Sequence, residues 1–196
     1  MSDLSEHFRL FIAIAVPEEI KAQIQTARDQ LRAGLSPAAV RWTRADQFHL
    51  TLRFLGSIQA DLVQPLVNEL GRLGQSLHPL KLQARGLGFF PNNRAPRVIW
   101  AGVQDLEQRL ATTQKAVQEM SARFSSEQPE RHFNGHITLG RVKHLRREEL
   151  HDLAGAAKQF ADSSFGEWTA RQVHLMRSEL SAEGAQHRVV AEIPFA

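Results

Sequence analysis

The chain has 196 residues, a formal net charge of +3 and no cysteine. The absence of cysteine excludes disulfides, thiolate nucleophiles and cysteine-ligated zinc. An apolar run over residues 10–16 is too short to cross a membrane and ends at Pro17 without a cleavage signature, so it predicts a buried strand rather than a signal peptide. We therefore expect a soluble, cytoplasmic protein with no membrane contact, and residues 1–196 are enough for a single domain.

Strand and helix patterns then alternate along the chain. Residues 18–32 predict a helix, because Ile20, Ile24, Ala27 and Leu31 fall on one stripe and Gly34 follows. The spacing of apolar residues in the rest of the chain predicts helices over 61–73, 106–124 and 147–160. Strands are expected over 8–16, 40–43, 48–55, 80–89, 98–103, 135–142, 173–180 and 187–195.

The order of these elements is similar in the two halves of the chain. We interpret it as an α+β fold, in which two pseudo-symmetric lobes of antiparallel sheet with flanking helices surround a central cleft. Together the lobes would form one bilobal domain over residues 1–196. The halves share little sequence otherwise, so this duplication is inferred from arrangement.

Two short segments repeat one pattern, His49-Leu50-Thr51-Leu52 and His136-Ile137-Thr138-Leu139. Because side chains alternate between the faces of a strand, each His shares a face with the Thr two residues later, while the apolar residues point to the core. One copy alone is typical of a strand with a solvated His. Two copies among nine histidines would arise by chance at about one in a thousand for this composition, so we interpret the pair as functional.

Two imidazoles and two hydroxyls on one cleft suit acid–base chemistry on a phosphate. Replacing one ester oxygen of a phosphate by an attacking water needs a base for the water proton and an acid for the leaving oxygen, on opposite sides of phosphorus. An imidazole, with an unperturbed pKa of about 6.5, can fill either role near neutrality. Thr51 and Thr138 can donate hydrogen bonds to the non-bridging oxygens, and Arg141 can add a charged donor. This scheme requires no metal ion or other cofactor.

The chain resembles the 2H phosphoesterase superfamily, and more narrowly its RNA 2′,3′-cyclic phosphodiesterase family, historically called 2′-5′ RNA ligases. The resemblance extends from about Arg9 to the C-terminus. It rests on the segments Arg9–Pro17, His49–Gly56, Pro96–Val103 and His136–Arg141, and on Met176–Leu180 followed by Gly184. The family commonly has an aromatic residue, often Tyr, a few positions after this Gly. Here Gln186 and His187 stand in that stretch and the chain has no Tyr, which puts a base-stacking role at that position in doubt.

The resemblance implies a bilobal 2H phosphoesterase fold and a reaction. His49 would be the general acid, protonating the 3′ oxygen, and His136 the general base on water, so that a 2′-phosphate forms. Run backwards with an RNA 5′-hydroxyl, the same site would make a 2′-5′ linkage. The expected partners are RNA with 2′,3′-cyclic phosphate ends or small cyclic nucleotides, and we expect a monomer.

Three further residues are candidate substrate contacts. Trp42 and Phe54 can stack on a nucleobase, although aromatic residues near strands more often belong to the core. Arg53 alternates onto the face of His49 and Thr51, which fits either a role in the cleft or a salt bridge at its rim.

Three alternatives remain open on the sequence alone. The first is a 2H phosphodiesterase with another cyclic-nucleotide or oligonucleotide substrate, which would use the same site. The second is a non-catalytic RNA-end-binding module, which predicts a damaged motif, whereas both motifs are intact. The third is a metal-dependent hydrolase, which would be sensitive to a chelator.

Overall fold

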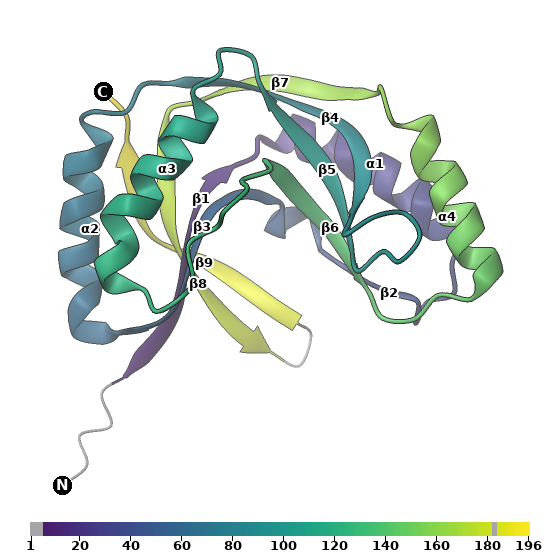
Figure 1. Cartoon of the computed structure of the whole chain (residues 1–196), viewed down its shortest axis with the longest axis horizontal. Coiled ribbons are helices and arrows are strands. Elements are labelled where there is room, and N and C mark those ends of the chain that lie inside the picture. Colours follow the sequence, from purple (N-terminus) through teal and green to yellow (C-terminus); the bar gives the residue numbers. More distant parts are fainter. Residues whose placement is uncertain (1–5, 182–183) are drawn as a thin grey trace, which may run out of the picture.

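The computed structural model describes residues 6–181 and 184–196, and these form one antiparallel sheet (Figure 1). The strand order is β7-β4-β5-β6-β3-β1-β8-β9, and β2 pairs with β6 off this path. The strands are β1 (His7–Ala15), β2 (Val40–Trp42), β3 (His49–Gln59), β4 (Leu80–Phe90), β5 (Val98–Asp105), β6 (His136–Val142), β7 (Ser164–Ala170), β8 (Gln172–Ser181) and β9 (Gly184–Pro194).

Two pairs of helices flank this sheet at its two ends (Figure 1). One pair is α1 (Glu18–Ala33) and α4 (Arg147–Gln159), which pack on each other and against β7 and β4 respectively. The other is α2 (Ala60–Gly74) and α3 (Leu110–Ser121), which pack on each other and on β3. Single 3₁₀ turns occupy Ala45–Gln47 and Ala122–Phe124.

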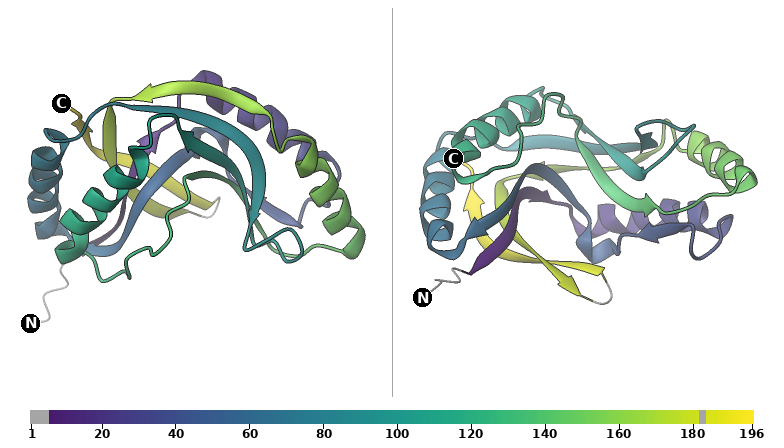
Figure 2. Two further views of the ribbon diagram at one scale, coloured as in Figure 1. Left: turned by 45° about the horizontal axis from the view of Figure 1, so that its top comes forward. Right: turned by 60° about the horizontal axis from the view of Figure 1, so that its bottom comes forward.

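The sheet divides into two halves of similar build, β6-β5-β4-β7 and β3-β1-β8-β9, which meet where β3 pairs with β6. Helix α1 follows β1 but packs on β7 of the other half, and α3 follows β5 but packs on β3. Each half of the sheet is therefore packed against a helix that follows a strand of the other half. Figure 2 shows that the whole sheet curls into an arch. The expected α+β fold with pseudo-symmetric antiparallel halves and flanking helices is confirmed. The two motif strands, β3 and β6, are direct neighbours in this sheet.

The core follows from the apolar periodicity. Ile20, Ile24, Ala27 and Leu31 of α1 are buried as their spacing predicts. On β3 and β6 the apolar positions of the two motifs, Leu50, Leu52, Ile137 and Leu139, are almost completely buried. No helix in the described ranges is both long and apolar enough to cross a membrane.

The structure departs from the predicted elements in several places. The strand expected to close at Gly56 continues to Gln59, because Gly56 adopts a φ of +74° that lets the strand bend opposite Leu10. The helix predicted from residue 106 begins at Leu110, since the Asp105 carboxylate accepts the backbone N–H groups of Glu107 and Leu110. Strand β7 is absent from the prediction altogether.

Candidate functional site

The two histidine motifs lie side by side on β3 and β6. These strands are antiparallel and pair Leu50 with Ile137. This register places His49 opposite Thr138 and His136 opposite Thr51, and residues directly opposite each other share a face of the sheet. Both imidazoles and both hydroxyls are therefore brought together on one surface, as the motif pattern predicts.

Each motif histidine is held by the backbone two residues before it. The Nδ1 of His49 is 2.8 Å from the carbonyl oxygen of Gln47, and the Nδ1 of His136 is 2.7 Å from that of Asn134. A carbonyl oxygen only accepts hydrogen bonds, so Nδ1 carries the proton in both rings. The Nε2 atom of each ring is then the one available for proton transfer. Sequence reasoning missed Gln47 and Asn134, because they act through the main chain and leave no side-chain signature.

Aromatic rings support both imidazoles. Phe11 of β1 lies 4.9 Å from His49 between ring centroids, and Phe90 of β4 lies 4.9 Å from His136, edge to face. His187 of β9 meets His49 edge to face at 5.0 Å, and its backbone N–H donates to the Gln47 side chain at 2.8 Å. His187 was not assigned to the site from the sequence. It stands where the family commonly has an aromatic residue, which is the signal that could have placed it there.

The surroundings of His49 favour its neutral form. Burial lowers the pKa of His49 to about 4; the hydrogen bond to Gln47 opposes this shift, while the positive charges that His187, His136 and Lys21 can carry reinforce it. Burial also lowers the pKa of His187. In the free protein His49 is therefore neutral at pH 7, and the surroundings of His187 also favour its neutral form.

A shared irregularity follows the threonine of each motif. On β3, Thr51 pairs with Ala13 of β1 and Arg53 pairs with Ile12, so Leu52 has no partner on β1. On β6, Leu139 likewise has no partner on β5. The extra residue reverses the alternation on each strand. As a result Phe54 and Arg141, each five residues after its histidine, return to the face that carries the imidazoles.

Arg53 consequently does not share the face of His49 and Thr51, and its predicted place in the cleft is wrong. Its side chain is only 5% exposed, and its guanidinium donates hydrogen bonds to the carbonyl oxygens of Gln128 and Glu127 at 2.7 and 2.6 Å. Strict alternation placed it in the cleft, because nothing in the sequence marks the bulge. Arg53 anchors the segment that follows α3 instead.

A cavity of about 490 Å³ opens on the site. Its lining includes His49, Thr51, Thr138 and Arg141, together with the aromatic candidates Trp42 and Phe54, and Phe54 is 57% exposed. His136 is not among the described lining residues; the register places it beside them on the same face, opposite Thr51.

The charge of this cavity is strongly positive. Arg9, Arg41, Arg44 and Arg141 line it, and Glu127 is the only acidic residue among the described lining residues. Arg41 lies directly opposite Arg141 across the β2–β6 pair. Within the described ranges, no ion pair involves Arg9, Arg41 or Arg141. Such unpaired guanidinium groups are suited to binding phosphate oxygens.

Comparison with known proteins places this arrangement in a family. The family model described as LigT-like phosphoesterase matches residues 14–100 and 102–185, which include both histidine motifs. The chain belongs to the LigT-like phosphoesterase family. The resemblance to 2H phosphoesterases noted from the motifs is thereby confirmed.

Individual relatives agree along nearly the whole chain. An RNA 2′,3′-cyclic phosphodiesterase of Methanocaldococcus jannaschii is 29% identical over 94% of this chain and 99% of its own, and one of Thermus thermophilus is 32% identical over 93% and 87%. Among solved structures, a protein of Thermus thermophilus has a TM-score of 0.78 at 26% identity, covering 95% of this chain and 97% of its own. The E. coli LigT protein in complex with 3′-AMP has a TM-score of 0.76 at 25% identity, covering 97% and 99%.

Proposed function

We propose that this phosphoesterase hydrolyses 2′,3′-cyclic phosphate ends of RNA to 2′-phosphates by two-histidine acid–base catalysis. The observation that carries the proposal is the pair of imidazoles on one face of β3 and β6, each with Nδ1 bound to a carbonyl and Nε2 free, beside an arginine-lined cavity. The names of its relatives, RNA 2′,3′-cyclic phosphodiesterases, support the substrate class.

In the proposed reaction, a water oxygen bonds to phosphorus while the bond from phosphorus to the 3′ oxygen breaks. The Nε2 atom of His136 takes the water proton, and Nε2–H of His49 protonates the departing 3′ oxygen. Thr51 and Thr138 donate hydrogen bonds to the non-bridging oxygens, and Arg141 neutralises charge that shifts there. The scheme assigns no step to a metal ion. With an RNA 5′-hydroxyl as the leaving or attacking group, the same steps permit reversible 2′-5′ ligation.

The low pKa of His49 sets a condition on its proposed role as the general acid. At about 4, it leaves the ring neutral at pH 7, so His49 must gain a proton before it can donate one. A bound phosphodiester supplies the cause, because a negative charge in contact with an imidazole raises its pKa. With the roles exchanged, His49 would act as the base in the neutral form that its surroundings favour.

The nucleoside is proposed to lie against Trp42 and Phe54. Both line the cavity, and the large exposed fraction of Phe54 leaves its ring free to stack on a base. The related E. coli LigT protein forms a complex with 3′-AMP, which supports a place for a nucleoside in this site.

The product isomer tests the proposal. A 2′,3′-cyclic phosphate-ended oligoribonucleotide is incubated with the protein in excess EDTA, and the product is identified by phosphorus NMR. We expect a 2′-phosphate. A 3′-phosphate product would mean that the 2′ oxygen leaves instead of the 3′ oxygen. No turnover by the folded protein would favour another cyclic substrate or an RNA-end-binding role.

A further inference from the structure

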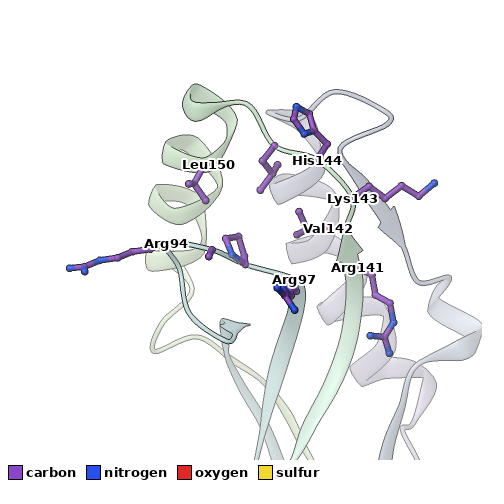
Figure 3. Close-up of a pocket in the computed structure, with 10 residues that line it drawn as sticks. Arg94, Arg97, Arg141, Val142, Lys143, His144 and Leu150 are labelled. Atoms are coloured by element: carbon purple, nitrogen blue, oxygen red, sulfur yellow. The ribbon is translucent and has the colours of Figure 1, made fainter.

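A second cavity, of about 580 Å³, opens beside the catalytic one (Figure 3). It lies between the loop that joins β4 to β5, the end of β6 and the residues that lead into α4. We call it the basic groove. Its polar lining residues are Arg94, Arg97, Arg141, Lys143 and His144, and the remaining lining is apolar.

The groove concentrates positive charge without compensation. None of the described residues that line it is acidic. In the part of the chain that the structure describes, Arg94, Arg97, Arg141 and Lys143 form no ion pair, although acidic residues of α4 are nearby in sequence. Unpaired cations gathered in a concave surface raise the local concentration of anions and favour a ligand with several negative charges.

The basic groove adjoins the catalytic cavity. Arg141 lines both, and it lies opposite Val98 across the β5–β6 pair. The next pair of residues is held by a hydrogen bond from the Val142 N–H to the Arg97 carbonyl at 2.9 Å. Figure 3 shows Arg97 just before β5 and Arg141 on the neighbouring β6, with Arg94 and Lys143 projecting to opposite sides of the groove. An anion chain that leaves the catalytic cavity at Arg141 would reach Arg97 and Arg94 around the end of β6.

We propose that the basic groove binds the phosphodiester backbone of the nucleotides that precede a 2′,3′-cyclic phosphate end. The preferred substrate is then an oligoribonucleotide rather than a mononucleotide. This inference rests on the proposed function, which places the terminal phosphate next to Arg141. Successive guanidinium groups can bind successive phosphates of a single strand, and such contacts give affinity without base specificity.

The test is the binding and hydrolysis of a long and a short substrate by two double variants. Arg94→Gln/Arg97→Gln removes two charges from the groove. Arg72→Gln/Lys115→Gln removes two charges from α2 and α3, at the other end of the molecule, and serves as the matched control. Binding is measured by fluorescence anisotropy with a labelled octaribonucleotide that ends in a 2′-phosphate, at salt concentrations from about 50 to about 200 mM.

The wild type and the control should show the same steep loss of RNA affinity with salt. For the groove variant, the slope of log affinity against log salt should be shallower by about 1.4, since each lost phosphate contact removes about 0.7 for a single strand. The ratio of the RNA affinity of the wild type to that of the groove variant should then fall about sevenfold across this fourfold range of salt. Equal slopes for the groove variant and the wild type would overturn the proposal.

Hydrolysis separates this proposal from the proposed function. The groove variant should lose kcat/KM on a cyclic-phosphate octaribonucleotide but keep it on a 2′,3′-cyclic mononucleotide. An equal loss on both substrates would also overturn the groove. If the wild type hydrolyses neither substrate, the proposed function fails, whereas RNA binding that depends on Arg94 and Arg97 still supports the groove.

Discussion

The backbone carbonyls of Gln47 and Asn134 decide which ring nitrogen of each motif histidine is free to react. Both rings donate from Nδ1, so the two Nε2 atoms are left free by the same local device. The environments of the rings nevertheless differ. His49 packs against Phe11 and His187, whereas His136 meets Phe90 edge to face. Two chemically identical side chains are thus placed in different surroundings, which suits different roles for them in one reaction.

At the residue scale, we predict that His49 titrates with a pKa near 4 in the free protein and markedly higher with a bound nucleoside 2′-phosphate. Burial lowers the pKa in the empty site, and the phosphate charge opposes that effect. Nitrogen-15 NMR of labelled histidines, with His49→Gln to assign the signal, measures both values. If the pKa stays near 4 in the complex, His49 cannot be the acid, and the roles of the two histidines must be exchanged.

At the scale of elements, the bulge after each motif determines what the cleft contains. It turns Phe54 and Arg141 into the cleft and directs Arg53 away from it. Gly140 occupies the bulge on β6, where a Cβ atom would lie 2.8 Å from Val40 Cγ1 and 3.0 Å from Trp42 Cε3. The size of this residue therefore controls how closely β2 and its Trp42 approach the site.

We predict that Gly140→Ala lowers the free energy of unfolding by about 1–3 kcal/mol through overpacking. It should also raise KM more than it lowers kcat, because the displaced Trp42 lines the cavity. Gly155→Ala on α4 is the matched control: its Cβ meets nothing within 4 Å, so it should stabilise the protein by up to about 1 kcal/mol. Denaturant unfolding and steady-state kinetics measure both effects, and a Gly140→Ala protein with wild-type stability and KM would refute this account of the bulge.

The start of α4 supplies a second prediction at this scale. Glu149 accepts hydrogen bonds from the Arg146 backbone and side chain and from the Ser36 N–H, and these hold its pKa well below the usual range. The ionised carboxylate therefore stabilises the fold at neutral pH, and this contribution is lost progressively as the pH falls below about 4.5, the ordinary value. Glu149→Gln should lower the free energy of unfolding at neutral pH, and by less in acid well below that value. A destabilisation that does not shrink with falling pH would contradict the role of this charge.

At the scale of the whole molecule, the pseudo-symmetric order of elements indicated the fold. Alternation in the two motifs was enough to identify His49, Thr51, His136 and Thr138 as residues on one surface. The alternation argument failed at Arg53, just after the first motif. The residues at the two bulges, Leu52-Arg53 and Leu139-Gly140, carry no sequence signal that predicts a bulge. Strand β7 escaped prediction since Gly166, with a φ of +119°, interrupts its pattern. The contact between His187 and His49 joins β9 to β3 and is visible only once the chain is folded.

The most direct test of the account is the single-turnover rate of hydrolysis of a 2′,3′-cyclic phosphate-ended oligoribonucleotide in excess EDTA. The wild type is compared with His49→Ala, His136→Ala and, as control, His151→Ala on the exposed side of α4. Loss of an acid or a base should slow the chemical step by about 10²–10⁴-fold in each motif variant and leave the control unchanged. Wild-type rates in either folded motif variant would contradict catalysis by two histidines.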